Sequence, residues 1–136
     1  MTDTSNSTLT IALAGNPNAG KTTLFNFLTG LKQKVANYPG VTVESRAGQW
    51  AAGDRPIDVI DLPGLYSLET TSIDESIARD VIEGKVEGTP RPDVIVAVVD
   101  STNLERNLYL VTQLFDFDLP VVVALTMMDV FEKRKH

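Results

Sequence analysis

Apolar runs and helix-spaced apolar residues alternate along the chain. The runs at 9–14, 57–60, 94–99 and 121–125 predict strands, and the roughly alternating apolar and polar residues at 41–51 predict one more. Five strands with three or four helices between them indicate an α/β fold with a mostly parallel sheet, in which ligands bind at the carboxyl ends of the strands. The expected buried helix faces are Leu24, Phe27, Leu28 and Leu31, then Ile73, Ile77 and Val81, then Leu104, Leu108, Val111 and Phe115.

Turn and cap signals mark the ends of these elements. Residues 32–40 are polar and predict a loop. The short turn at residues 53–56 predicts that the strands on either side of it pair as an antiparallel hairpin within the otherwise parallel sheet. Capping-box patterns at residues 72–75 and 102–105 predict where the second and third helices begin.

Composition restricts the classes of partner and site. The chain has 136 residues, enough for one domain with a substantial core, and its formal net charge of −6 argues against nucleic-acid binding. It has no cysteine, which excludes disulfides and thiolate metal sites. Its longest apolar runs are too short to span a bilayer, so we expect no membrane insertion of this chain. The polar start does not resemble a signal peptide, and residues 1–8 are expected to form a flexible tail.

The strongest chemical motif lies between the first predicted strand and the first predicted helix. Residues 15–22 match the phosphate-binding pattern G-x-x-x-x-G-K-[ST]. In this motif backbone N–H groups and a helix N-terminus face the phosphates, the lysine reaches the terminal phosphates and the last hydroxyl binds Mg²⁺. The alternative is a chance match in a glycine-containing loop, and the flanking strand and helix argue against it. The residues expected to contact the nucleotide are Gly15, Asn16, Pro17, Asn18, Ala19, Gly20, Lys21, Thr22 and Thr23.

A second motif, Asp61-Leu62-Pro63-Gly64, stands at the end of a predicted strand. An aspartate there can hold the water shell of Mg²⁺, and the glycine lets a backbone N–H approach the γ-phosphate of the nucleotide. On its own the pattern is usually a turn. Following a phosphate loop, it predicts that all four residues contact the nucleotide or its metal ion.

A third position lies in the sequence Gly40-Val41-Thr42, between the first helix and the second strand. The Thr42 hydroxyl and carbonyl are suited to close over Mg²⁺ and the γ-phosphate. Taken alone, a β-branched residue that opens a strand is the simpler interpretation. The two motifs above favour the ligand role, so we predict that these three residues contact the nucleotide and that Thr22, Thr42 and Asp61 bind Mg²⁺.

The fourth candidate follows the last predicted strand, at Thr126, Met127 and Asp129. A carboxylate at Asp129 can accept both hydrogen bonds from the N1–H and N2–H₂ edge of guanine, which adenine does not offer. The alternative is a solvent-exposed aspartate that caps a following helix. The position beyond a strand end, on the ligand side, favours a guanine contact.

Together these motifs resemble a Ras-like GTPase domain, a P-loop NTPase. More narrowly, the phosphate loop, the sequence NYPGVTVE at 37–44 and the sequence DLPGLYSL at 61–68 resemble the N-terminal G domain of the bacterial ferrous iron transport protein B family. The resemblance implies binding of GTP and GDP with Mg²⁺, slow GTP hydrolysis at the cytoplasmic face of the inner membrane, and regulation of Fe²⁺ uptake through a separate membrane domain. It also implies that residues 9–136 are a G domain that lacks its final strand, helix and base-contacting loop. Helical and membrane domains of the parent protein would be its partners, and a dimer through the switch loops, the segments around Thr42 and Gly64, is a further expectation.

Three positions matter for this resemblance. The fourth motif of the family begins with an asparagine that contacts guanine and braces the phosphate loop, and Thr126 replaces it here, as in Rho-type GTPases. Ras-like enzymes orient the attacking water with a glutamine at the position of Leu65, which cannot do so, and this predicts slow turnover. Asn18 resembles the residue that holds K⁺ in potassium-activated GTPases, with a turn-forming asparagine as the alternative. We expect Lys21, Thr42, Gly64 and Asn18 to act in hydrolysis.

Two other functions stay open. One is a P-loop enzyme that uses ATP, against which Asp129 and the lack of a basic lid segment argue. The other is a truncated, non-catalytic nucleotide-binding or interaction module. On either interpretation we expect this chain by itself to be soluble and cytoplasmic.

Overall fold

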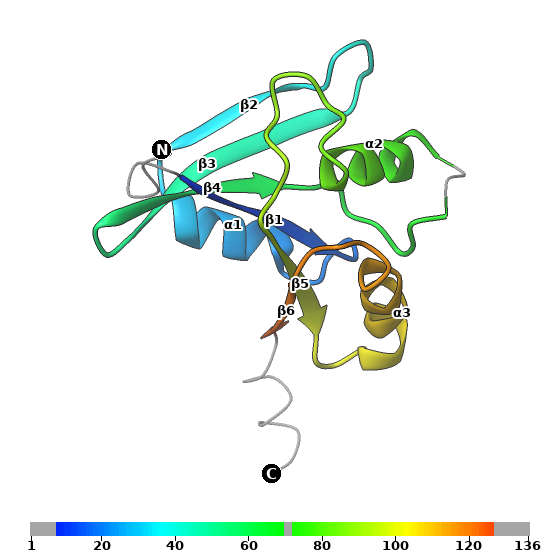
Figure 1. Ribbon diagram of the computed structural model, residues 1–136. Coiled ribbons are helices and arrows are strands. Elements are labelled where there is room, and N and C mark those ends of the chain that lie inside the picture. The colour runs from blue at the N-terminus through cyan, green and yellow to red at the C-terminus, as the bar shows by residue number, and fades with distance from the viewer. Residues whose placement is uncertain (1–7, 70–71, 127–136) are drawn as a thin grey trace.

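A six-stranded sheet with helices on both of its faces forms the domain (Figure 1). The computed structural model describes residues 8–69 and 72–126, so the expected tail at 1–8 lies almost wholly outside the described residues. Among the described residues, no helix has the length and apolarity that crossing a bilayer requires. The elements are β1 (Leu9–Gly15), α1 (Lys21–Thr29), β2 (Gln33–Asn37), β3 (Glu44–Ala52), β4 (Arg55–Asp61), α2 (Ile73–Ile82), β5 (Val94–Asp100), α3 (Leu104–Leu114) and β6 (Val121–Thr126).

The strand order is β2-β3-β4-β1-β5-β6. Strand β1 pairs in parallel with β4 and β5, and β6 pairs in parallel with β5. The predicted hairpin is confirmed, because β3 and β4 pair antiparallel from Arg46 opposite Asp61 to Ala52 opposite Arg55. This mixed, mostly parallel sheet carries the ends of β1, β4, β5 and β6 to one edge, where Asp61 and Thr126 contact the phosphate loop and the first residue of α1.

The prediction of a loop at 32–40, and with it the count of five strands, was wrong. Residues Gln33–Asn37 form β2, an edge strand paired antiparallel with β3, and four of its five residues are exposed. Such a strand has no buried face, so its sequence carries no apolar alternation and cannot be told from a polar loop by pattern. Its backbone hydrogen bonds to β3 define it instead.

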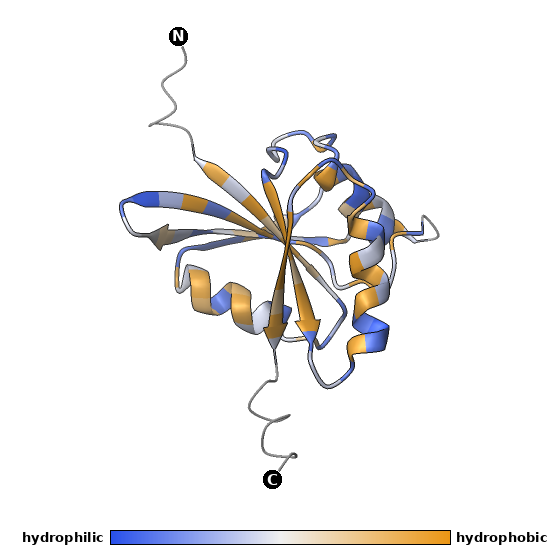
Figure 2. Cartoon of the chain, turned by 60° about the horizontal axis from the view of Figure 1, so that its bottom comes forward, coloured by the Kyte–Doolittle hydropathy of each residue, from blue (hydrophilic) through white to orange (hydrophobic). Residues whose placement is uncertain are grey.

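Two clusters of buried side chains form the core, one on each face of the sheet. The larger lies under α2 and α3 and includes Leu68, Val81 and Leu110, whereas the smaller lies under α1 and centres on Phe25. Figure 2 shows the hydrophobic residues running along the strands between these layers. Helix α1 lies close to β3 because Gly48 has no side chain: a Cβ there would come within 2.7 Å of the Thr29 side chain at the end of α1.

The predicted buried faces of α1 and α3 were largely wrong. Helix α1 buries Lys21, Phe25 and Thr29, four residues apart, while Phe27 and Leu31 are 83% and 102% exposed. The phosphate loop sets this phase, because it turns Lys21, the first helical residue, inward. The buried face of helix α3 also differs from the predicted one. Of the four residues expected on its buried face, only Val111 is buried, and the other three, Leu104, Leu108 and Phe115, are exposed. The buried face consists instead of Asn107, Leu110, Val111 and Leu114.

The two predicted capping boxes had different outcomes. The Ser72 hydroxyl accepts a hydrogen bond from the Glu75 N–H at 3.2 Å and the Glu75 carboxylate accepts one from the Ser72 N–H, so α2 begins as predicted. The box at 102–105 does not form. Asn103 is the N-cap of α3, and the Thr102 hydroxyl instead donates to Asp100 at 2.6 Å. On α2, Val81 is buried and Ile77 packs against the core, whereas Ile73 is 58% exposed.

Candidate functional site

The phosphate loop joins the end of β1 to the start of α1 in the conformation that its sequence requires. Gly20 is the N-cap of α1 with φ +91°, and Asn18 has φ +68°, the only positive φ outside glycine among the described residues. Asparagine tolerates this left-handed backbone better than most residues. The loop and the N-terminus of α1 therefore border a hollow of about 500 Å³ whose free N–H groups suit an anion. Its lining residues are Asn16, Pro17, Asn18, Gly20, Lys21, Thr22, Thr23 and Gly64.

Lys21 and Asp61 form a buried ion pair beside this hollow. The Lys21 Nζ contacts Asp61 Oδ1, and the two side chains are only 8% and 5% exposed. Burial raises the pKa of Asp61, and the neighbouring Lys21 charge acts in the opposite direction. The structure thus brings together a cation and a carboxylate that the sequence assigned to phosphate and Mg²⁺, and each charge compensates the other in the low-dielectric interior.

Gly64 also lines the hollow. It packs against Pro17, so closely that a Cβ at Gly64 would lie 3.2 Å from the Pro17 backbone. The next residue, Leu65, donates its N–H to the Gly15 carbonyl at 2.9 Å and is 4% exposed. Its side chain belongs to the larger core cluster and not to the hollow, which is a structural role that sequence reasoning missed. Leu62 is buried as well, and its N–H bonds the Leu13 carbonyl.

The segment at 40–42 does not line the hollow. Tyr38 is 3% exposed, and Val41 and Val43 pack against the larger core cluster. The Tyr38 N–H donates to the Val43 carbonyl at 2.9 Å, which closes a turn with Thr42 exposed on its outer side. In this conformation Thr42 is apart from the phosphate loop, although the sequence groups the two.

Thr126 ends β6 directly against the phosphate loop. Its Oγ1 lies 2.5 Å from the Ala19 carbonyl oxygen, to which the hydroxyl donates, and its side chain would be 3.4 Å from a Cβ on Gly20. Ser101 fixes the Thr126 carbonyl with two donors, its N–H at 3.0 Å and its hydroxyl at 2.6 Å. No sequence motif singled out Ser101. Met127 and Asp129, the remaining base-site predictions, lie outside the described residues.

Asn16 is the least satisfied residue of the site. It is 4% exposed, and neither polar atom of its side-chain amide has a hydrogen-bond partner within the described part of the chain. It also borders a smaller hollow of about 170 Å³ toward α3, where the Arg106 guanidinium lies 4.2 Å from the centre of the Tyr66 ring. Buried amides in proteins are normally paired, so this group is suited to a polar ligand or water.

The donor set fits Mg²⁺ and a monovalent cation. The Thr22 hydroxyl and the Asp61 carboxylate carry oxygen atoms of the kind that would serve Mg²⁺, which in nucleotide sites adds water and substrate phosphates as its other ligands. The described residues hold no cluster of three or more His, Cys, Asp or Glu side chains. The Asn18 amide oxygen at the border of the hollow is of the type that K⁺ accepts.

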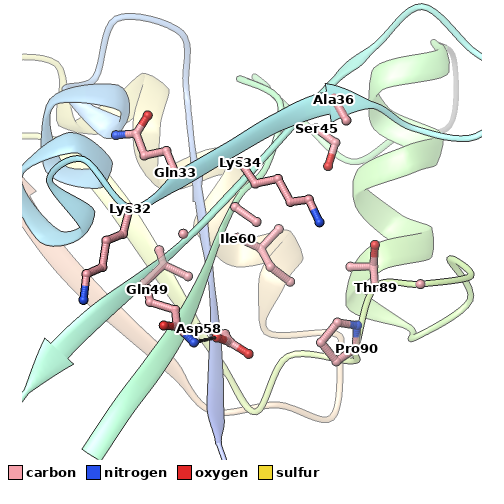
Figure 3. Close-up of a pocket in the computed structure, with 14 residues that line it drawn as sticks. Lys32, Gln33, Lys34, Ala36, Ser45, Gln49, Asp58, Ile60, Thr89 and Pro90 are labelled. Atoms are coloured by element: carbon pink, nitrogen blue, oxygen red, sulfur yellow. Dashed lines mark hydrogen bonds between the residues drawn. The ribbon is translucent and has the colours of Figure 1, made fainter.

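A further hollow of about 580 Å³ lies away from this edge, on the face of β2, β3 and β4 that α1 does not cover (Figure 3). Figure 3 shows Lys34 reaching across it and Gln49 bonded to Asp58, at 3.3 Å, on its lower border. Its walls, which include Ala36, Ile60 and Pro90, carry none of the predicted site residues. The phosphate-loop hollow is therefore the candidate site, although it is the smaller of the two.

Comparison with known proteins agrees with this geometry. Residues 9–136 match the family described as ferrous iron transport protein B. The chain is 51% identical over 132 residues to the Fe(2+) transporter FeoB of Salmonella typhimurium, which covers 93% of this chain and 16% of that protein. An S. thermophilus NFeoB mutant bound to mGDP has a TM-score of 0.86 and 47% identity over 95% of this chain and 47% of its own. The cytosolic domain of the T. maritima FeoB iron transporter in its GMPPNP form has a TM-score of 0.86 and 46% identity, over 93% of this chain and 48% of its own.

Proposed function

The chain belongs to the ferrous iron transport protein B family, within which it matches the G domain, and from this premise we propose that it binds GTP and GDP and hydrolyses GTP slowly. The observation that carries the proposal is the phosphate loop with Lys21 and Asp61 side by side at its edge. A triphosphate with Mg²⁺ satisfies both groups, because the phosphates take the lysine and the metal ion takes the carboxylate. Relatives of this fold bound to mGDP and GMPPNP support the choice of nucleotide.

Each residue of the hollow has a defined task in this proposal. The loop N–H groups and Lys21 bind the phosphates, Thr22 and Asp61 hold Mg²⁺, and the Gly64 N–H meets the γ-phosphate. Mg²⁺ supplies neutralisation of the charge that develops on the phosphate oxygens. Thr42 is exposed and apart from the hollow, so we propose that the triphosphate draws its segment inward when it binds.

The direct test is calorimetric titration of the chain with GDP and with ADP, in the presence of Mg²⁺. We expect heat of binding and a raised unfolding temperature with GDP, and neither with ADP at the same concentration. Equal affinity for the two would favour an ATP-using enzyme. Binding of GDP without release of phosphate from GTP would favour a non-catalytic nucleotide-binding module.

We propose a role in Fe²⁺ uptake for the longer protein in which such a domain occurs. The chain spans 16% of the length of the curated transporters that it matches. In this proposal the nucleotide state of the G domain, at the cytoplasmic face of the inner membrane, regulates a membrane domain through a helical domain. A dimer through the segments around Thr42 and Gly64 would place two hollows near one another.

Potassium is expected to accelerate GTP turnover about tenfold relative to sodium. A cation held by the Asn18 oxygen would neutralise charge where other GTPases use an arginine finger. The measurement is phosphate release in matched KCl and NaCl for the parent chain and for Asn18→Gly. Glycine accepts the positive φ of this position, so it removes the oxygen and preserves the loop conformation.

The same experiment separates the cation role from a turn role. We expect Asn18→Gly to lose the difference between the two salts, whereas Asn18→Ala adds backbone strain at φ +68° and confounds the result. If Asn18→Gly keeps the potassium effect in full, Asn18 acts only in the turn and the cation lies elsewhere.

Thr126→Val is expected to speed GDP dissociation about fivefold, since a net hydrogen bond contributes about 1 kcal/mol. The substitution keeps the shape of the side chain and removes the hydroxyl that donates to Ala19. Release of a fluorescent GDP analogue measures the rate. Thr126→Ser, which keeps the hydroxyl, is the matched control and is expected to behave as the parent. A parental rate of GDP dissociation in Thr126→Val would mean that the hydrogen bond from Thr126 to the Ala19 carbonyl does not support the nucleotide site.

A second substitution at this position tests the family residue. Thr126→Asn, which restores the carboxamide usual in the family, is expected to bind GDP more tightly.

A further inference from the structure

The segment at residues 65–69, directly after Gly64, has no regular secondary structure, and side chains of α2 and α3 hold it. Leu65 is tied to the end of β1 through the Gly15 carbonyl. Beyond it the partners change. The Tyr66 ring lies under Arg106 and the Glu69 carboxylate accepts a hydrogen bond from the Tyr109 hydroxyl at 2.7 Å.

Leu68 is the most firmly held residue of this segment. Its N–H donates to the Gln113 side-chain oxygen at 2.7 Å, and its carbonyl accepts from Arg79 Nη2, also at 2.7 Å. Its side chain is 1% exposed within the larger core cluster. A buried peptide group outside a helix or sheet needs such partners, and here two different helices supply them.

Arg79 is held in turn by a contact of its own. Its guanidinium carbon lies 5.5 Å from the centre of the Phe117 ring, within the range of a cation–π interaction. Neither Arg79 nor Gln113 lines the hollow of the phosphate loop, so neither touches the nucleotide. Both nevertheless hold Leu68, in the segment that directly follows Gly64.

We propose that Gln113 and Arg79 are positioning residues for GTP hydrolysis. By fixing both peptide groups of Leu68 they hold Gly64 against Pro17, where its N–H can meet the γ-phosphate. The inference rests on the proposed GTPase function and extends it to two residues that no motif marks. It follows that their loss reduces turnover and leaves GDP binding intact, since GDP has no γ-phosphate for Gly64 to contact.

The experiment compares Gln113→Met with Gln113→Glu in the 136-residue chain. Methionine fills the same space without a strong acceptor, and glutamate restores an oxygen for the Leu68 N–H. Arg79→Met tests the second bond in the same way. Gln49→Met, on β3 and remote from the segment, is the matched control for the glutamine-to-methionine change. For each variant kcat and KM for GTP, the Kd for GDP and the unfolding temperature are measured.

We expect kcat about tenfold lower in Gln113→Met and in Arg79→Met, because an unmade hydrogen bond of a buried peptide group loosens the segment. GDP affinity should stay within about threefold of the parent, and Gln113→Glu and Gln49→Met should turn over GTP at the parental rate.

Two results would overturn the positioning role. One is a parental kcat in Gln113→Met and Arg79→Met. The other is a parallel loss of GDP affinity and unfolding temperature, which marks a purely structural contact. A parent chain that binds GDP and releases no phosphate from GTP would overturn the proposed hydrolysis itself, and the positioning role with it.

Discussion

Replacing Lys21 with alanine should weaken binding of GTP and GDP at least a hundredfold, which corresponds to about 2.7 kcal/mol. Lys21 is the cation at the phosphate-loop hollow, buried at 7% exposure and held by Asp61. Without it, the β- and γ-phosphates of GTP lose their ammonium partner and face the Asp61 carboxylate directly. Calorimetric titration measures the change, with Lys34→Ala, an exposed lysine on β2, as the control that should bind like the parent.

Loss of Lys21 also leaves a buried carboxylate without its counter-charge. Removing one partner of a buried ion pair costs about 3–5 kcal/mol of folding free energy, so a folding defect must be separated from a binding defect. The double variant Lys21→Met with Asp61→Asn removes both charges at similar volume and is expected to fold. Nucleotide affinity within about threefold of the parent in a folded Lys21→Ala chain would show that the loop does not bind phosphates in the way proposed.

Asp129→Asn should move the base preference from guanine toward xanthine by at least a hundredfold, about 2.7 kcal/mol in the difference of binding free energies. In the proposed base site the Asp129 carboxylate would accept two hydrogen bonds from guanine, whereas an amide would donate to the 2-carbonyl of xanthine and leave a guanine N–H unpaired. Titrations with GDP and with xanthosine diphosphate give the ratio directly. Glu132→Gln, which also removes one negative charge three positions further along the chain, should leave this ratio unchanged.

A preference for GDP that survives the Asp129 substitution would remove this residue from the base site. Guanine recognition would then depend on other parts of the protein. Since Thr126 already directs its hydroxyl to Ala19, that residue has no second proton to donate to the base. The titrations of the Asp129 variant therefore show whether Asp129, rather than Thr126, recognises the base.

The sequence predicted the parts of this domain that local chemistry determines. The phosphate loop, the strands with a buried face and the β3–β4 hairpin depend on glycines, apolar runs and a short turn, all of which are visible in the chain. The phase of α1 was missed because Lys21 must face inward, so that Phe25 is buried where spacing favoured Phe27. The spacing of apolar residues does not show that a polar residue, here Lys21, has to face inward.

Contacts between residues far apart in the chain could not be predicted from the sequence either. Ser101 supports Thr126 across 25 residues, and Gln113 supports Leu68 across 45. Both are polar side chains that hydrogen-bond to backbone groups. Every residue has a backbone, so a pattern of residue types cannot show which backbone group such a side chain will bind. The exposed position of Thr42 was not visible in the sequence either, because it follows from the burial of Tyr38 and from the packing of the half-buried Val41 and Val43 against the larger core cluster.

The bond between Thr126 and Ala19 has a consequence for how the protein is made. These residues are 107 positions apart in the chain, so the loop lacks this support until β6 has left the ribosome and docked beside β5. Contacts of such long range form late, after the entropy of closing the intervening chain has been overcome. A nascent chain that ends before residue 126 therefore contains the whole phosphate motif and should still bind nucleotide weakly. Ribosome-stalled chains of increasing length, probed with a fluorescent GDP analogue, would show the gain in affinity only once β6 has emerged.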